Sequence, residues 1–188
     1  AINMMPSNKL SNYIFQNNQD LTFSNTTKKW GLDAKVNSNG AVYADLDNDG
    51  DLDLVVNNQA DEAQIYQNNA VNNFVTFSFN GPNNNKNGIG ASVKVYAGDL
   101  QQSKELFISR GYQSSVTNKL NFGLGEQTNI DSVKVIWPGG SQELLTNVEV
   151  NKSHQLDYKK AKENIHNKAV ITSLFEDISP EDIGINYY

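Results

Sequence analysis

The 188-residue sequence predicts an all-β chain in which a propeller-blade-like repeat is followed by a β-sandwich. Three observations indicate this fold class. Short, mostly alternating apolar runs are separated by turn residues, residues 73–158 show no convincing 3.6-residue apolar period, and one six-residue motif occurs twice. Alternation places every second side chain on one face of a strand, whereas a helix needs apolar residues three or four positions apart.

The first segment, residues 1–70, carries the repeated motif. Residues 13–18 read Tyr-Ile-Phe-Gln-Asn-Asn and residues 64–69 read Gln-Ile-Tyr-Gln-Asn-Asn, which is an offset of 51 positions. Periods of about 20–50 residues are typical of propeller blades and solenoids. Residues 42–44 and 54–56 are short apolar strands of the kind found in a blade. We therefore expect about one repeat unit in this segment.

The second segment, residues 71–158, predicts an antiparallel β-sandwich. Seven runs are expected to be strands: residues 74–79, 91–96, 105–109, 120–122, 131–137, 143–145 and 154–158. Their i, i+2 spacing puts one set of side chains on the inner faces of the two sheets. The expected core residues are Val93, Val95, Phe107, Leu120, Phe122, Val133, Val135 and Trp137.

The last segment, residues 159–188, is expected to be a polar tether that leads into a further repeat-like stretch. Residues 175–179 read Phe-Glu-Asp-Ile-Ser and resemble residues 23–27, Phe-Ser-Asn-Thr-Thr. We expect the chain to be part of a longer polypeptide. A lone blade leaves a face uncovered, so Leu54, Val55 or Ile65 is expected to lie against the sandwich, the segment around Phe175 or another polypeptide.

Composition excludes some classes of partner. The net charge is −6, which disfavours nucleic acid because phosphate binding requires clustered Lys and Arg. There is no cysteine, so no disulfide or thiol chemistry is available. No stretch approaches the roughly 18 apolar residues of a membrane-spanning helix.

The most informative motif is an acidic loop that predicts a calcium site. Residues 45–56 read Asp-Leu-Asp-Asn-Asp-Gly-Asp-Leu-Asp-Leu-Val-Val. Calcium takes six to eight oxygen ligands, and alternate residues of a curled loop can direct oxygens at one centre. The expected ligands are Asp45, Asp47, Asp49, Asp51 and Asp53, with Asp51 contributing its backbone carbonyl. Gly50 permits the positive φ that reverses the chain.

Two other interpretations of the loop are weaker. An EF-hand needs a bidentate Glu at loop position 12, where this chain has Val56 at the end of a strand-like run. A solvated acidic turn would hold five aspartates close together without a cation, and their mutual repulsion disfavours it. Ca²⁺ is therefore the only cofactor that we expect.

These motifs carry a family resemblance. The acidic loop with its flanking Gln-Asn-Asn units resembles an FG-GAP or VCBS repeat, a calcium-bearing blade. Residues 89–95, 109–115, 121–125 and 131–140, in that order, resemble the ASPIC/UnbV domain. The combination is similar to the cartilage-acidic-protein-like group, whose Asn-rich, Cys-free members are frequent among Bacteroidetes surface and secreted proteins. The resemblance implies calcium binding at the five aspartates and no catalytic residue.

Other residues leave alternatives open. Arg110 and Tyr112 could bind an anion or a sugar, or Arg110 could pack over Tyr112 or pair with Glu105 at a sheet edge. Trp30 and Trp137 could form a sugar platform, although they are expected to be core anchors.

Two classes of function follow. The first is a non-catalytic, calcium-binding extracellular interaction module, part of a larger surface or secreted protein that binds a protein or cell-surface partner. The second is a carbohydrate-binding accessory component of a nutrient-uptake or polysaccharide-degrading assembly, which would expose aromatic rings beside polar groups. Either would be located outside the cell or on a bacterial outer-membrane surface. We do not expect an enzyme, because the carboxylates concentrate in the loop and none elsewhere forms an evident acid/base pair.

Overall fold

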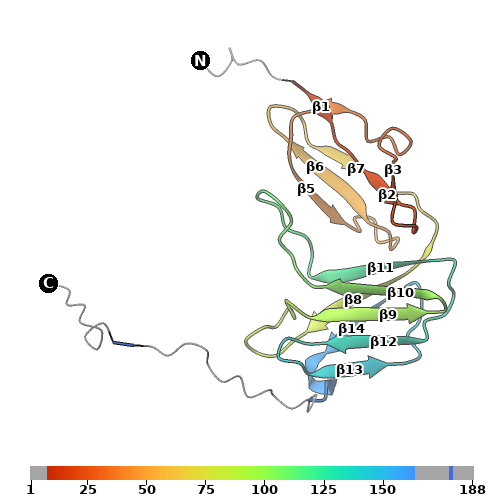
Figure 1. The fold of residues 1–188 in the computed structure, drawn as a ribbon, viewed down its shortest axis with the longest axis vertical. Coiled ribbons are helices and arrows are strands. Elements are labelled where there is room, and N and C mark those ends of the chain that lie inside the picture. Colours follow the sequence, from red (N-terminus) through yellow and green to blue (C-terminus); the bar gives the residue numbers. More distant parts are fainter. Residues whose placement is uncertain (1–7, 164–177, 180–188) are drawn as a thin grey trace.

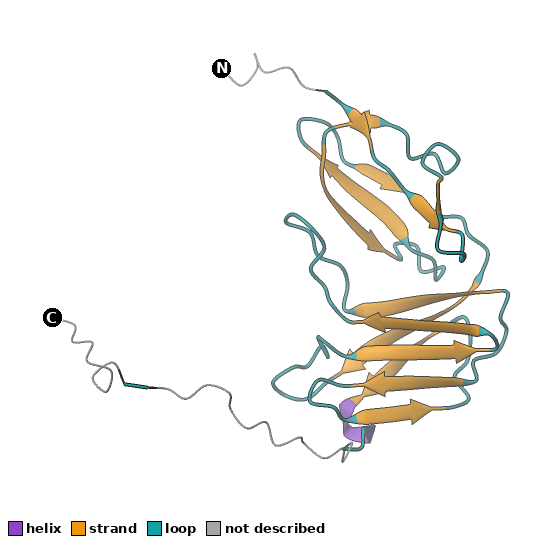
Figure 2. Cartoon of the chain, in the orientation of Figure 1, coloured by secondary structure: helices purple, strands orange, loops and turns teal. Residues whose placement is uncertain are grey.

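The computed structural model describes residues 8–163 and 178–179, and within them the fold is nearly all β (Figures 1 and 2). A small group of strands precedes a two-layer sandwich, and within the described ranges the one helical element is the short 3₁₀ turn η2 (Tyr158–Lys160). No helix in the described ranges has the length and apolar character needed to cross a membrane. The all-β prediction is confirmed.

The sandwich consists of two open sheets. One sheet has the order β10-β9-β12-β13 and the other has the order β11-β8-β14. The strands of the first are β9 (Ser92–Ala97), β10 (Leu100–Glu105), β12 (Ser132–Ile136) and β13 (Gln142–Leu145). The strands of the second are β8 (Asn73–Asn80), β11 (Lys119–Gly125) and β14 (Lys152–Asp157).

Period-2 alternation builds the core of the sandwich. Along β9 the side chains of Val93 and Val95 are buried, and their antiparallel neighbours Val135 and Val133 on β12 are buried with them. Phe77 on β8 meets Phe122 on β11 edge to face, at 5.9 Å between ring centroids. Fully burying one such side chain stabilises the fold by roughly 1.5–3 kcal/mol. Seven of the eight expected core residues are therefore confirmed.

The exception is Phe107, which is 57% exposed, so its expected inward position is wrong. The strand that pairs with β9 is β10, which ends at Glu105, and the backbone N–H of Leu106 then donates to the carbonyl of Ala91. That register directs Leu106 inward and Phe107 outward, since a shift of one residue exchanges the two faces of a strand. The expected strand over residues 105–109 is wrong for the same reason.

The expectation of a purely antiparallel sandwich also needs correction. Strand β14 pairs with β8 in parallel, with Leu156 opposite Phe79, whereas β11 pairs with β8 in the antiparallel direction. A parallel pair needs a long crossover, which the chain between β8 and β14 supplies.

The blade-like segment contains a three-stranded antiparallel meander and two short ribbons. The meander has the order β5-β6-β7, and the ribbons are β1-β4 and β2-β3. The meander strands are β5 (Ser38–Ala44), β6 (Asp53–Asn58) and β7 (Gln64–Tyr66). The ribbons are formed by β1 (Leu10–Ser11) with β4 (Lys35–Val36) and by β2 (Phe15–Asn17) with β3 (Phe23–Asn25).

The repeated motif explains where the sandwich begins. Its two copies contain β2 and β7, and the first copy continues into β3, which starts at Phe23. The same 51-residue offset takes Phe23 to Phe74, which belongs to β8. At the position where the first copy adds a strand to the blade, the second copy therefore enters the sandwich.

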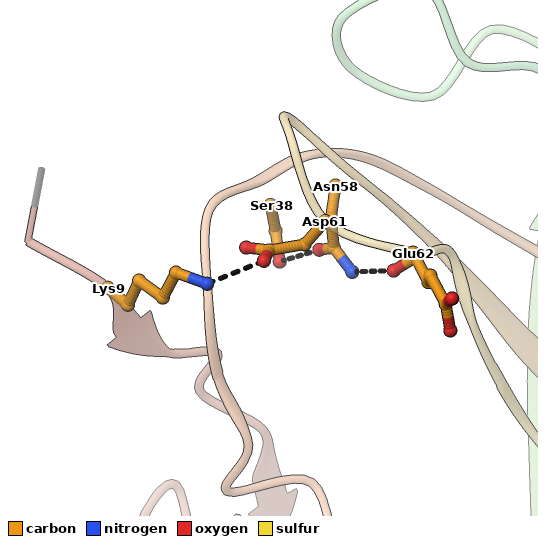
Figure 3. A network of polar contacts seen from close by, with 5 residues as sticks. All are labelled: Lys9, Ser38, Asn58, Asp61 and Glu62. Carbon is orange, nitrogen blue, oxygen red and sulfur yellow. Dashed lines mark hydrogen bonds and ion pairs between the residues drawn. The ribbon is translucent and has the colours of Figure 1, made fainter. Parts of the chain in front are cut away.

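A network of polar contacts joins the start of β5 to the end of β6 and the turn that follows it (Figure 3). The hydroxyl of Ser38 donates to Asn58 Oδ1 at 3.0 Å, and Asn58 Nδ2 donates to the carbonyl of Glu62 at 2.7 Å. Lys9 forms an ion pair with Asp61 beside this pair. Asn58 is buried, so both groups of its amide need these partners.

Much of the apolar surface of the blade-like segment lacks a cover within the described residues. Ile65 is 69% exposed, so the described residues leave most of it uncovered, while Leu54 lines a groove with Tyr13 and Leu32. The segment around Phe175, another expected cover, lies outside the described residues. Trp30 is 46% exposed, so its expected core position is wrong, whereas Trp137 is fully buried as expected.

Candidate metal centre

The acidic loop connects β5 to β6 at the end of the meander that faces the sandwich (Figure 1). Two residues in it adopt left-handed backbone conformations, Asn48 with φ 63° and Gly50 with φ 96°. Asn tolerates this region better than most residues, and glycine adopts it freely. These two positions curl the loop, as the sequence predicted for Gly50.

Three aspartates converge in the curled loop. One carboxylate oxygen each from Asp45, Asp47 and Asp49 lies within 4.8 Å of the other two. Two oxygens that are each 2.3–2.6 Å from one calcium ion lie at most about 4.6–5.2 Å apart. The three side chains can therefore share one ion with small adjustments.

The unpaired oxygens of the loop support a fit to a cation. Asp45 Oδ2 accepts the N–H of Gly50 at 3.2 Å, but Asp45 Oδ1 is shielded from solvent and has no hydrogen-bond partner among the described residues. Burying a charged oxygen without a partner is costly, and a hard divalent cation is a suitable partner for it. The donor set therefore fits calcium, with Asp45, Asp47 and Asp49 as the residues that would hold it.

Asp51 has a different set of contacts. Its Oδ2 accepts the N–H of Ala70 at 3.1 Å, while its Oδ1 is enclosed and unpaired in the described structure. Burial raises the pKa of the Asp51 carboxyl, and the negative charge of Asp49 raises it further. The backbone-carbonyl role of Asp51 stays a prediction.

Asp53 begins β6 and is 2% exposed. Its two oxygens each accept a backbone N–H at 2.9 Å, from Leu46 and from Asn68. Asp53 therefore holds the start of the loop and the segment after β7 in place through hydrogen bonds. It does not belong to the group of three converging carboxylates. A ligand role for it stays a prediction.

Hydrogen bonds from one residue outside the loop and one residue within it orient the carboxylates. Gln67 Nε2 donates to Asp47 Oδ2 at 2.7 Å, and the N–H of Asp51 donates to Asp49 Oδ1 at 3.0 Å. Sequence reasoning missed Gln67, although it belongs to the repeated Gln-Asn-Asn motif, and that repetition was an available signal.

The loop also contacts the sandwich directly. Asn121 Nδ2 on β11 donates to the carbonyl of Gly50 at 2.7 Å and lies 3.1 Å from Thr76 Oγ1. Gly50 is buried, and a Cβ at this position would lie 2.0 Å from the Phe74 ring. The acidic loop and the sandwich therefore meet in a close contact, in which a side chain at position 50 would clash with the Phe74 ring.

Arg110 adds a second contact between the two segments. Arg110 Nε donates to the hydroxyl of Tyr43 on β5 at 3.1 Å, and the guanidinium lies 5.9 Å from the Tyr43 ring centroid and 6.0 Å from that of Phe107. The alternatives of packing over Tyr112 or pairing with Glu105 do not occur in the described structure. Tyr112 is 68% exposed, in the long β10–β11 loop that reaches toward β5 (Figure 1).

These contacts border a cleft of about 500 Å³. It is lined by Tyr43 and Asp45 from the blade-like segment and by Lys104, Phe107 and Arg110 from the sandwich, among others. Lys104 Nζ donates to the carbonyl of Asn121 at 2.6 Å and lies 5.2 Å from the Phe122 ring centroid. The Lys104 residue as a whole is exposed. Burial of its amine nevertheless lowers the pKa of that amine, because protein replaces water around it.

Comparison with family models assigns both segments. A model described as FG-GAP-like repeat matches residues 5–56, a range that includes the whole acidic loop, and a model described as ASPIC and UnbV matches residues 81–163. No curated protein matches the chain. The chain therefore combines an FG-GAP-like repeat with an ASPIC and UnbV domain.

Proposed function

We propose that this chain is a calcium-binding, non-catalytic interaction module of an extracellular or surface protein. The observation that carries the proposal is the convergence of the carboxylates of Asp45, Asp47 and Asp49. Asp45 also has a shielded oxygen with no partner among the described residues. The extracellular or outer-membrane-surface location rests on the FG-GAP-like repeat, a type that typically occurs in extracellular or surface proteins. The expected partner of this module is a protein, a cell surface or another part of the same polypeptide.

The contacts of the loop indicate what calcium would do. An ion would neutralise carboxylates that otherwise repel one another, and it would fix the backbone between Asp45 and Asp51. Because the carbonyl of Gly50 within that stretch accepts from Asn121, a fixed loop also holds the repeat on the sandwich. Calcium would thus set the arrangement in which both segments present their loops to a partner.

Weak calcium affinity would suit this role. Extracellular calcium modules work with dissociation constants of about 10⁻⁴–10⁻³ M. We expect no catalysis, since the convergent carboxylates of the described chain belong to the loop itself.

Titration calorimetry with calcium tests the proposal. The unmodified chain should bind one ion, and Asp45→Asn should weaken binding at least tenfold because the shielded oxygen loses its charge. Asp99→Asn is the matched control, since it removes one exposed carboxylate from the turn between β9 and β10. Absence of calcium binding at millimolar concentration, or equal isotherms for Asp45→Asn and the control, would overturn the proposal.

A further inference from the structure

The cleft between the repeat and the sandwich concentrates positive charge in an acidic protein. Four cations line it, Lys104, Arg110, Lys119 and Lys152, in a chain whose net charge is −6. Lys152 is paired with Glu149. The other three form no ion pair with a carboxylate in the described structure.

The hydrogen-bond partners of Lys104 and Arg110 leave the positive charge of both side chains uncompensated. Lys104 donates to a backbone carbonyl, and Arg110 donates to a phenol and to the carbonyl of Ser109. The carboxylates that line the cleft are Asp45 and Glu105. Three unpaired cations therefore exceed these two carboxylates. Asp47 and Asp49 lie beside Asp45, so the positive excess is largest when calcium neutralises this group of aspartates. A partly shielded site with excess positive charge favours an anion.

The neutral groups of the cleft point to a ligand that also carries hydroxyls and flat apolar faces. Tyr43 and Phe107 are 38% and 57% exposed, and both rings lie within 6.0 Å of the Arg110 guanidinium. The side chains of Asn48, Thr117 and Ser153 line the same cleft and make no hydrogen bond within the described chain. Rings suit the faces of sugar rings, and free hydroxyl and amide groups suit sugar hydroxyls.

We propose that this cleft binds an acidic carbohydrate, with a uronate carboxylate held by Arg110 and Lys104 and the sugar ring against Tyr43 or Phe107. The volume of about 500 Å³ lies within the usual range for small-ligand sites and admits a short oligosaccharide. An acidic peptide would supply carboxylates for the cations. It would offer fewer hydroxyls to the polar side chains of the cleft and no sugar ring to Tyr43 or Phe107. This inference goes beyond the calcium proposal, and binding of the acidic sugar is expected to be tightest with calcium present, because the ion would neutralise the aspartates beside the cleft.

A matched pair of probes isolates the carboxylate. Oligomers of β-1,4-linked glucuronate and of β-1,4-linked glucose differ only at C6, so calorimetry with both measures the contribution of the acid group. We expect the glucuronate oligomer to bind at least tenfold more tightly, since hydrogen bonds between charged groups are about twice as strong as neutral ones. Measuring in excess EDTA as well as in calcium separates this site from the metal site.

Variants then locate the binding. Arg110→Gln and Lys104→Gln should each reduce affinity for the glucuronate oligomer at least tenfold, whereas Lys134→Gln, on the outer face of β12, should leave it unchanged. Thermal melting checks that each variant is folded. The proposal is overturned if the unmodified chain binds neither oligomer, if both oligomers bind equally, or if both cleft variants bind like the control. Equal binding of an oligoglutamate of the same length would show a site for acidic peptide instead.

Discussion

Substituting Gly50 by alanine tests the contact between the acidic loop and the sandwich. Two costs add at this position. A non-glycine residue at φ 96° carries backbone strain of roughly 1–3 kcal/mol. The new methyl would also lie 2.0–2.4 Å from three atoms of the Phe74 ring, and overpacking of this kind costs roughly 1–3 kcal/mol. We expect a total destabilisation of about 2–6 kcal/mol.

A double-mutant cycle separates the two costs. Phe74→Leu shortens the side chain that the methyl would meet, so Gly50→Ala should cost less in the Phe74→Leu background by the steric part, while the backbone part remains. Urea unfolding followed by both tryptophan fluorescence and circular dichroism is the assay, because two probes reveal whether the repeat and the sandwich unfold together. In calcium-free buffer the measured free energies contain no contribution from a bound ion.

Two results would refute this reasoning. A change in unfolding free energy below about 0.5 kcal/mol for Gly50→Ala would show that the loop does not rest on Phe74 as described. Equal costs of Gly50→Ala in the two backgrounds would show that the substitution acts through the backbone only.

The remaining predictions concern the sandwich. Phe122→Ala should destabilise it by about 3–5 kcal/mol, because the ring is fully buried against Phe77, and chemical denaturation should show a midpoint shift far larger than that of Leu144→Ala on the exposed side of β13. Burial raises the pKa of the Glu143 carboxyl, so its ionised form is disfavoured in the folded state. Because the pKa of the Glu143 carboxyl is higher in the folded state than in the unfolded state, its contribution to stability is full at pH values below the unfolded-state pKa. This contribution is lost as the pH rises through the folded-state pKa. Melting temperatures across pH 3–8 should therefore show Glu143→Gln gaining stability relative to the unmodified chain as the pH rises, and a pH-independent difference would contradict this.

The parts of the fold that were predictable from the sequence are those set by local pattern. Val93 and Val95 alternate with polar neighbours, so their burial followed from the period of two. The stretch from Leu106 to Ile108 is apolar at consecutive positions, and only pairing with β9 decides which of its side chains turns inward. The β10 strand itself is mostly polar and gave no alternating apolar signal.

The candidate metal site likewise has features that the sequence predicts and features that depend on contacts distant in the sequence. The aspartates lie within one short loop, so their spacing predicted that they could meet, and three of them do. The contacts of the loop with Asn121 and of Tyr43 with Arg110 join residues 71 and 67 positions apart, and no local pattern encodes them. The burial of Asp53 against two backbone N–H groups likewise depends on how the segment after β7 returns to the loop.

A crystal structure of the chain grown in millimolar calcium tests the central claim most directly. We expect one ion bound by oxygens of Asp45, Asp47 and Asp49 at about 2.3–2.6 Å, with the carbonyl of Asp51 among the further ligands. Aspartate side chains that point into solvent with no ion between them, in crystals saturated with calcium, would contradict the claim.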